Sequence, residues 1–368
     1  MARYVWQDKA WPQLTWSAKE LESVLSSASY RLGVFLGRLS GIGFELRNQA
    51  GFEALSDEIV SSSAIEGETL NRADVRSSVA RRMDIVLSGP QTRGDHDMES
   101  RVDLMMDATR NWEAPMTKKR LFGWHAALFP TGYSGLVKVR TGAFRRDEDG
   151  PMRVVSRYGN LERVHFEAPP ARRLQQEMMN FLRFLAAEAE MPPLVGVALA
   201  HLRFLTLHPF EDGNGRLARA LTEWLLARAE RSALRFYSLS SQIQREKDDY
   251  YGEIERAQRN GLDVTRWVSW FVGCHQRAVE SAEGRLSGIL NKAAFWQTHA
   301  KDDMNAHQRE MLNRLLDGFE GNMTSSKWAK ICKVSQDTAS REIAALVGNG
   351  LLRQVGQGRS THYELKGN

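Results

Sequence analysis

Residues 208–219 read His208-Pro209-Phe210-Glu211-Asp212-Gly213-Asn214-Gly215-Arg216-Leu217-Ala218-Arg219. An imidazole precedes a turn that proline stiffens, and a carboxylate precedes a glycine-rich bend that exposes backbone N–H groups. The apolar positions that follow have helical spacing, and a helix N-terminus favours an anion through its unpaired amides and its dipole. Arg216 and Arg219 are three residues apart and therefore project from one helix face. Together these groups are suited to phosphate chemistry.

Taken one at a time, these residues have ordinary structural interpretations. A single histidine is more often a hydrogen-bonded structural residue, an Asp-Gly pair is commonly a turn, and two arginines commonly form a solvated face. Here they fall within twelve consecutive positions. Because nearly every position has a role in one reaction, the functional interpretation is favoured.

The stretch resembles the signature HPFx[DE]GNGRxxR of the Fic (filamentation induced by cyclic AMP) domain enzymes and matches it without a departure. Upstream, Gly142-Ala143-Phe144-Arg145 and residues 152–155 and 164–170 are similar to the family's flap hairpin and its exit. Downstream, residues 250–251 and 263–267 are similar to its closing helices. The resemblance covers residues 112–277 and implies a mainly α fold, a Fic-type helical bundle with a short β-hairpin flap.

What the resemblance implies is an ATP-dependent protein adenylyltransferase. It would transfer AMP to a Ser, Thr or Tyr hydroxyl of a target protein or of the chain itself, and release pyrophosphate. His208 would be the general base, and Asp212 would hold Mg²⁺, or Mn²⁺, against the phosphates. The triphosphate would be bound by the anion hole and two guanidinium groups: Gly213, Asn214 with its side chain, Gly215, Arg216 at the β/γ region and Arg219 at the γ-phosphate.

A second informative stretch contains Ser62, Glu66 and Gly67. In a helix, Ser62 and Glu66 share one face, and Gly67 can end that helix in a left-handed conformation. Such spacing alone arises by chance in many helices. Beside the Fic-like motif, however, it resembles the family's inhibitory pattern [ST]xxxE[GN] in an N-terminal position. The resemblance implies autoinhibition, in which Glu66 pairs with Arg219 and prevents productive ATP binding, since Arg–carboxylate pairs are strong and specific.

Alternation of side chains predicts two short strands, residues 152–156 and 163–166, around Tyr158-Gly159-Asn160. A target segment could add to this hairpin as a strand, and the alternative is a surface hairpin without a role. The docking residues would be Met152, Arg153, Val154, Val155, Val164, His165 and Phe166. Tyr250 and Tyr251 are candidates to line the nucleotide site, and they are equally compatible with core packing.

The remaining sequence predicts three further segments. Residues 1–111 form an N-terminal helical extension, with tryptophans 6, 11 and 16 as packing anchors, a helical pattern over residues 17–46 and the inhibitory helix at about residues 56–67. Residues 278–304 are a helical connector, and residues 305–368 have the pattern of a winged helix-turn-helix. Four residues of its second helix are of types that read base edges: Gln336, Thr338, Ser340 and Arg341.

The partner of the C-terminal segment stays open between DNA and protein. From residue 327 onward there are seven Lys or Arg against three Asp or Glu, a modest excess for a surface that follows phosphates. Winged helices attached to enzymes also serve protein contacts or dimerisation. A homodimer is a further expectation, since inhibited Fic proteins of this organisation often dimerise.

Composition bounds the remaining possibilities. A net charge of +5 and 42% apolar residues are those of a globular protein that permits, but does not require, acidic partners. The two cysteines, Cys274 and Cys332, and the lack of a CxxC pair argue against a disulfide framework or a zinc site. No apolar signal core or membrane-length run is present, which predicts a soluble, cytoplasmic protein without a membrane partner.

Three alternatives to the main prediction stay open. The first is an enzyme that removes AMP, alone or in addition, with Glu66 positioning water. The second is transfer of a different phosphate-containing group, against which the intact motif argues. The third is a DNA-binding regulator in which the Fic core is accessory.

Overall fold

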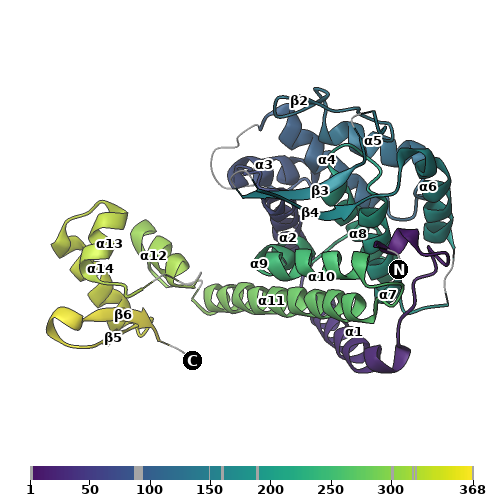
Figure 1. Cartoon of the computed structure of the whole chain (residues 1–368). Helices are drawn as coiled ribbons and strands as arrows, with labels where there is room; N and C mark the ends of the chain where they lie inside the picture. The colour runs from purple at the N-terminus through teal and green to yellow at the C-terminus, as the bar shows by residue number, and fades with distance from the viewer. Residues whose placement is uncertain are drawn as a thin grey trace. The chain divides into compact units, whose positions relative to one another are not determined.

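The computed structural model describes residues 3–86, 94–148, 150–158, 161–187, 190–299, 302–316, 319 and 321–366. The chain divides into two compact units, residues 1–282 and residues 283–368 (Figure 1). Within the described ranges, no helix is both long and apolar enough to cross a membrane. The finer four-part division predicted from the sequence stays a prediction.

The first unit is built mainly of helices, as predicted. They are η1 (Val5–Gln7), α1 (Ala18–Ser40), α2 (Phe44–Ile65), α3 (Arg72–Arg82), α4 (His96–Arg110), α5 (Lys118–Leu128), α6 (Ala171–Ala186), α7 (Pro193–Leu207), α8 (Asn214–Glu230), α9 (Leu239–Arg245), α10 (Lys247–Arg259) and the start of α11 (Thr265–Thr298). The described strands of this unit form two antiparallel hairpins: β1 (Tyr133–Ser134) with β2 (Val137–Lys138), and β3 (Arg153–Tyr158) with β4 (Leu161–Glu167).

The core of this unit lies around the pair α7 and α8, which pack on each other and also on α6 and α4. α7 is apolar on almost every face and buried along nearly its whole length, as the run of apolar residues predicts. Trp224 of α8 and Trp267 of α11 are completely enclosed. The indole of Trp267 donates a hydrogen bond to the carbonyl of Ala198 in α7 (2.8 Å), which fixes α11 against the same core. The loop between α7 and α8 is therefore held at both ends.

The helical pattern predicted over residues 17–46 is two helices, not one. Ser17 caps the start of α1 by accepting a hydrogen bond from the Glu20 N–H. Gly41 is the C-cap of α1 and Gly43 is the N-cap of α2. These glycines divide the predicted helical pattern because glycine favours caps over a helix interior.

The N-terminal extension packs on the core of the first unit through α2. It packs on α3, α4, α8 and α9. Glu58, which is buried, accepts hydrogen bonds from the Ser238 hydroxyl (2.7 Å), the Ser240 N–H (2.9 Å) and the Ser240 hydroxyl. These groups lie at the N-terminus of α9, where a carboxylate satisfies unpaired donors and the helix dipole. The end of α2 is thereby placed close to α8 and α9.

The β3–β4 hairpin is present where two strands were predicted, and both strands are longer than predicted. The pairing extends to Arg157 with Glu162 and to Tyr158 with Leu161. A side-chain hydrogen bond between His165 Nε2 and the Ser156 hydroxyl (2.7 Å) also crosses the two strands. A register shift between Val154 and Val155 marks a bulge. Phe166 packs edge-on against Tyr4 at 5.2 Å, so one face of the hairpin is covered. Of the predicted turn, residues 159–160 lie outside the described residues.

The second unit contains α12 (Ala306–Leu316), α13 (Ser325–Cys332), α14 (Gln336–Gly348) and the hairpin of β5 (Leu352–Val355) with β6 (His362–Leu365). Its core surrounds Trp328, whose indole donates to Glu342 (2.8 Å). Met323 forms an isolated antiparallel β-bridge with Tyr363 of β6. The order of helices and hairpin is the predicted one, while the assignment to the winged helix-turn-helix class stays a prediction.

Glu58 provides a test of how α2 is held. We expect Glu58→Gln to lower the free energy of unfolding by about 2 kcal/mol, because it weakens hydrogen bonds to a buried carboxylate. Urea unfolding followed by tryptophan fluorescence measures this change. The matched control is Glu53→Gln on the same helix, where the Arg76 pair is about one-quarter exposed and should contribute at most about 1 kcal/mol. Equal effects of the two substitutions would contradict the anchoring role of Glu58.

Candidate active site

His208 lies where α7 ends and the motif loop begins. Its backbone is left-handed (φ 46°, ψ 58°), and its N–H still donates to the carbonyl of Phe204 (3.0 Å). Arg145 Nε donates to the His208 carbonyl (2.7 Å) and so holds the residue from the other side. Burial, assisted by the nearby Arg145 charge, lowers the pKa of His208 to about 4. The imidazole is therefore neutral near pH 7, the form that can accept a proton.

His125 of α5 packs against the motif loop. Its ring stacks on Phe210 at a centroid distance of 4.1 Å. Nδ1 accepts the Gly142 N–H (3.0 Å), which leaves Nε2 to donate to the carbonyl of Asp212 (3.3 Å). Burial lowers the pKa of His125 to about 4, so it is also neutral near pH 7. These contacts give His125 a structural role beside the motif loop.

The side chain of Asn214 closes the motif loop. Its Oδ1 accepts the Phe210 N–H (3.0 Å) and its Nδ2 donates to the Phe210 carbonyl (2.8 Å). The residue is 2% exposed. The sequence interpretation placed this side chain in an anion hole, whereas its two hydrogen bonds with Phe210 give it the task of shaping the loop. The backbone N–H of Asn214, at the first turn of α8, is the group that points to an anion.

Two glycines are required by the space around them. Gly213 is left-handed (φ 78°), and a Cβ on it would lie 2.9 Å from Phe129 Cε2. A Cβ on Gly215 would lie 2.0 Å from Oε1 of Glu66. A side chain at either position would therefore collide with its neighbours. At Gly215 the missing side chain makes room for a carboxylate at the N-terminus of α8, where a helix favours negative charge.

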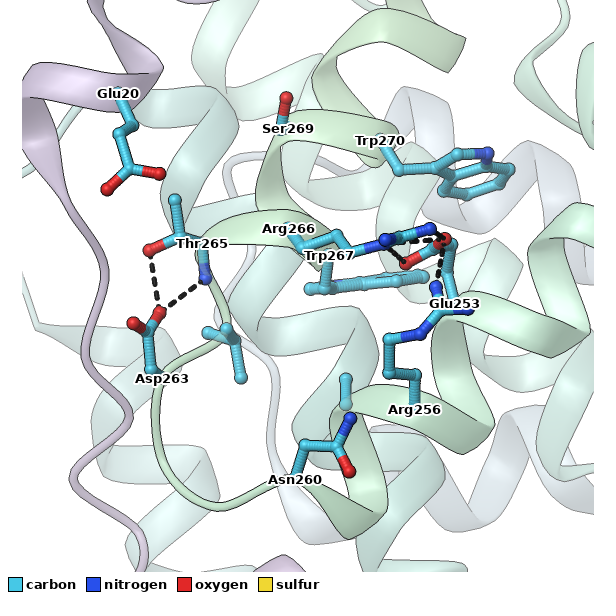
Figure 2. A pocket seen from close by; sticks show the side chains of 12 residues that line it. Glu20, Glu253, Arg256, Asn260, Asp263, Thr265, Arg266, Trp267, Ser269 and Trp270 are labelled. Atoms are coloured by element: carbon cyan, nitrogen blue, oxygen red, sulfur yellow. Dashed lines mark hydrogen bonds and ion pairs between the residues drawn. The ribbon is translucent and has the colours of Figure 1, made fainter.

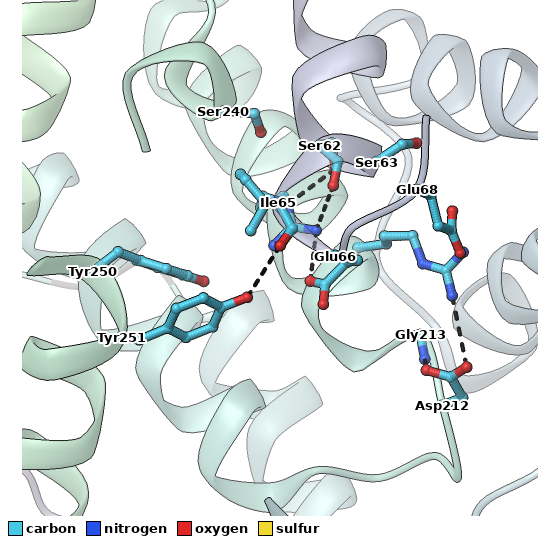
Figure 3. A network of polar contacts seen from close by, with 12 residues as sticks. Ser62, Ser63, Ile65, Glu66, Glu68, Asp212, Gly213, Ser240, Tyr250 and Tyr251 are labelled. Carbon is cyan, nitrogen blue, oxygen red and sulfur yellow. Dashed lines mark hydrogen bonds and ion pairs between the residues drawn. The ribbon is translucent and has the colours of Figure 1, made fainter. Parts of the chain in front are cut away.

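Arg219 is bound by the end of α2, where Figure 3 shows Ser62 and Glu66 close together. Nε donates to the Ser62 hydroxyl (2.9 Å), and Nη2 donates to the Ser62 carbonyl (2.8 Å) and to Oε1 of Glu66 (2.8 Å). Arg219 is 2% exposed. Burial alone would lower the pKa of Arg219, but Glu66 and the neighbouring tyrosines outweigh it, so that the pKa is raised. Gly67 follows in the left-handed conformation (φ 81°) predicted for it.

Arg216, the other arginine of the motif, is held by a different carboxylate. Nη1 donates to Oε1 of Glu68 (2.8 Å), and the other oxygen of Glu68 accepts a hydrogen bond from Arg101 of α4. The Arg216 guanidinium also lies 5.0 Å from the centre of the Phe129 ring. Sequence reasoning identified neither Glu68 nor Arg101. The only available signal was the acidic residue two positions after Glu66.

Asp212 is the predicted metal ligand. One oxygen accepts the Gly213 N–H (2.6 Å) and the other lies 3.9 Å from Arg216 Nη2, with the side chain 45% exposed. The described residues contain no cluster of three His, Cys, Asp or Glu that could hold a metal by themselves. One accessible carboxylate beside a phosphate site nevertheless fits Mg²⁺, which is commonly held by one or two carboxylates, water and substrate phosphates.

The two tyrosines of α10 differ in accessibility. Tyr250 is 1% exposed, and its hydroxyl bonds His201 Nε2 (2.8 Å) inside the core. Tyr251 is 43% exposed and its hydroxyl lies 3.4 Å from the carbonyl of Ile65, beside the end of α2. Burial, with the charge of Glu66, raises the pKa of Tyr251 to about 12. The core interpretation suits Tyr250, and Tyr251 remains a candidate to contact a nucleotide.

The predicted flap residues fall into two groups. Val154 and Val155 are each 37% exposed. Phe166 is 1% exposed and the partly buried Met152 packs with it and with Tyr4, so these two anchor the hairpin. The remaining three are engaged at the edges of the hairpin: Arg153 with Glu167, His165 with Glu255, and Val164 through its carbonyl with Arg259.

A cleft of about 700 Å³ lies elsewhere, between α10, the start of α11 and Glu20 of α1 (Figure 2). Trp267 and Trp270 stack at 5.6 Å on one wall, and Glu253 is bound there by Arg266 (2.9 Å). No residue of the 208–219 motif lines it. Because the chemical groups are gathered at the motif, this larger cleft is not the candidate active site.

Comparison with known families places the motif in a recognised domain. Residues 115–226 match the Fic/DOC family, residues 4–85 match a domain of unknown function (DUF4172), and residues 317–366 match the C-terminal domain of the DIP2311-like transcriptional regulators. The chain is 26% identical over 234 residues to the protein adenylyltransferase Fic of Drosophila yakuba and 27% identical over 234 residues to that of Drosophila melanogaster. These matches cover 62% of this chain and 42% of each relative, so the chain spans less than half the length of these relatives.

Solved structures share the fold. A Fic family protein from Desulfovibrio desulfuricans aligns with a TM-score of 0.54 and 20% identity, covering 97% of this chain and 98% of that one. A Fic-domain-containing signaling protein from Bacteroides thetaiotaomicron aligns with a TM-score of 0.51 and 16% identity, covering 73% and 98%. The 208–219 motif thus lies in a Fic/DOC-family domain, and the chain is a homologue of the Fic protein adenylyltransferases.

Proposed function

We propose that this protein transfers AMP from ATP to a hydroxyl side chain of a target protein, or of itself, and that Glu66 restrains the reaction. The observation that carries the proposal is the convergence of a neutral His208, the N-terminus of α8 and two buried arginines on one loop. The homology to proteins named protein adenylyltransferase Fic supports the choice of AMP.

In the proposed reaction, the target hydroxyl attacks the α-phosphorus, and the bond to the α–β bridging oxygen breaks, so that pyrophosphate leaves. His208 takes the hydroxyl proton. The low pKa of His208 keeps its nitrogen lone pair available, and the left-handed cap with the Arg145 contact restricts its position. The nucleophile belongs to the substrate, so the chain need supply only positioning and charge stabilisation.

The phosphates would be bound by the first turn of α8. The backbone amides of Gly213, Asn214 and Gly215 provide donors, and Arg216 and Arg219 provide charge. Asp212 would hold Mg²⁺, or Mn²⁺, which supplies charge neutralisation of the phosphate oxygens when bound. The exposed carboxylate of Asp212 and the lack of a complete ligand set in the described residues are consistent with a metal that arrives with the nucleotide.

Restraint by Glu66 follows from the space that it occupies. Its carboxylate lies against Gly215 at the N-terminus of α8 and hydrogen-bonds Arg219. An anionic phosphate group that approached this end of α8 and the same guanidinium would meet a negative charge. ATP would therefore bind weakly or out of line until Glu66 moves.

The target would dock along β3. Arg259 donates to the carbonyls of Val164 (2.8 Å) and His165 (2.9 Å) on the outer side of β4, whereas β3 pairs only with β4 among the described strands. An extended target segment could therefore add to β3 through backbone hydrogen bonds. The half-exposed Val154 and Val155 would contact its side chains.

Label transfer tests the reaction. With α-³²P-ATP, Glu66→Gly should label target proteins in a cell lysate, or the chain itself, at least about tenfold more strongly than wild type, since the competing charged contact is lost. His208→Ala in the Glu66→Gly background should reduce labelling about a hundredfold or more. γ-labelled ATP is the control and should give no label.

Two results would contradict the proposal. Label from the γ-position would mean that a different group is transferred. Equal labelling by wild type and Glu66→Gly would remove the inhibitory role of Glu66 while leaving AMP transfer in place.

The pH dependence tests His208. Because burial lowers the pKa of His208 to about 4, the imidazole becomes protonated, and can no longer act as a base, only as the pH falls through that value. The kcat/KM of Glu66→Gly for ATP, which reports the pKa of the free enzyme, should therefore stay constant between pH 8 and about pH 5.5, well below the ordinary histidine value. Glu66 itself raises the pKa of His208. Removal of Glu66 therefore shifts the acidic limb of the pH profile to still lower pH. A half-maximal kcat/KM near pH 6.5, with circular dichroism unchanged, would refute the buried-base assignment.

Removal of AMP is an alternative activity of the same site. Glu66 and Asp212 both lie beside the proposed phosphate site and could position water. Release of AMP from a modified target that is abolished by Glu66→Ala would favour this reaction over addition.

Regulation through DNA is a second candidate function. It is favoured by the match of residues 317–366 to the C-terminal domain of a transcriptional regulator. On α14, Gln336, Ser340 and Arg341 are exposed, as base or phosphate contacts require. The Fic core would then be accessory.

Fluorescence anisotropy with a labelled duplex tests the DNA candidate. Binding by the full chain should weaken steeply between 50 and 200 mM salt, as expected for phosphate contacts. Arg341→Ala should reduce the slope of log K against log salt concentration by about one. Arg314→Ala on α12, an exposed arginine paired with Glu310, is the matched control and should bind as wild type. Equal binding by both variants would exclude α14 as the contact.

A further inference from the structure

The geometry points to a second inhibitory carboxylate. We propose that Glu68 occupies Arg216 in the resting protein, as Glu66 occupies Arg219, and that Arg101 retains Glu68 when the nucleotide takes Arg216. The inference rests on the proposed function, because it concerns regulation of the same nucleotide site.

The first support is position. Glu66 and Glu68 come from one short segment that folds back on the end of α2, where the Glu68 N–H donates to the carbonyl of Ser63 (3.1 Å). From this segment each glutamate reaches a different arginine of the motif: Glu66 reaches Arg219 and Glu68 reaches Arg216, both at 2.8 Å. Both guanidinium groups proposed for phosphate are therefore neutralised by the same piece of chain.

The second support is burial. The Arg216 side chain is 6% exposed and that of Glu68 is 34% exposed, so Glu68 lies on the solvent side of the pair, where a nucleotide would arrive. Nε of Arg216 is buried without a hydrogen-bond partner among the described residues. A buried guanidinium requires an anionic partner, and Glu68 supplies one at 2.8 Å. A phosphate could replace Glu68 and meet the same requirement.

The third support is the shared partner. Glu68 bonds Arg216 with one oxygen and Arg101 with the other, and Arg101 also donates to the Ser63 hydroxyl (3.2 Å). When Arg216 turns to a phosphate, Glu68 would keep its contact with Arg101. Neither the arginine nor the carboxylate is then left as an unpaired charge, which would be costly. The exchange is balanced because α4 supplies this extra cation.

A purely structural tether would behave differently. If Glu68 only positioned Arg216 for phosphate, its removal would weaken nucleotide binding. If Glu68 competes with phosphate, its removal strengthens binding. The sign of the change in affinity therefore separates the two roles.

The test measures binding apart from turnover. Isothermal titration calorimetry with Mg²⁺ and α,β-methylene ATP, which cannot release AMP, is applied to the full chain. Glu68→Gln should tighten binding about fivefold, the effect of a partly exposed ion pair, and should add to the gain of Glu66→Gly. Glu68→Asp, which is too short for a good contact, should show a smaller gain.

Arg101→Met should act in the opposite direction and weaken binding about fivefold, because Glu68 is then held by Arg216 alone. The matched control is Glu53→Gln, whose partner Arg76 lies outside the site, and it should bind as wild type. Thermal unfolding confirms that each variant is folded.

Outcomes separate this inference from the proposed function. If Glu66→Gly gains affinity while Glu68→Gln and Glu68→Asp do not, the second carboxylate is not inhibitory and the proposed function stands. If no folded variant binds the nucleotide, both are overturned.

Discussion

The arrangement of the site depends on one buried cation. Arg219 lies inside the first unit, where a guanidinium without an anionic or hydrogen-bonding partner would be costly. Its partners, Ser62 and Glu66, belong to a helix more than 150 residues earlier in the chain. The need to satisfy this charge joins the end of α2 to the first turns of α8. In the proposed function, the same need explains why a phosphate can take the place of Glu66.

The loop between α7 and α8 has its shape from several independent contacts. His208 and Gly213 are both left-handed, and these positions bend the chain out of one helix and into the next. Asn214 closes the bend by pairing with both backbone groups of Phe210, and His125 stacks beneath it. Because these groups come from α5, α7 and α8, the loop is held in place before any ligand binds. Such preorganisation is what a site that acts by positioning requires.

The segment that carries Glu66 and Glu68 is held less firmly than the loop that it covers. Glu66 and Glu68 are each about one-third exposed, whereas Arg216 and Arg219 are almost completely enclosed. Glu58, deeper in α2, is buried against α9. The contrast suits a helix whose body is anchored in the core while its end can exchange carboxylates for phosphates. In the proposed function, the anchored part would set the position of the two glutamates, and the exposed end would allow their release.

Sequence reasoning identified much of this organisation for physical reasons that are local. The run of apolar residues in α7 predicts a buried helix, the glycines at 213 and 215 predict a tight turn before a helix, and Gly67 predicts a left-handed cap. Each depends on backbone conformation or on periodicity within a few residues. The pair of Glu66 with Arg219 is not local, and it was predicted through the resemblance rather than from spacing.

Only the tertiary structure decided which groups meet across the fold. Nothing in the local sequence indicates that Arg101 of α4 and Arg216 of α8 share Glu68, because that contact depends on how three helices pack. The same holds for the two adjacent tyrosines. The sequence pattern alone could not show that Tyr250 is buried beside His201 while Tyr251 is exposed. The Asn214 side chain was predicted to meet an anion and instead closes the loop. Local chemistry therefore determined the parts of the site and the packing of helices decided their partners, since burial and charge pairing are properties of the folded chain.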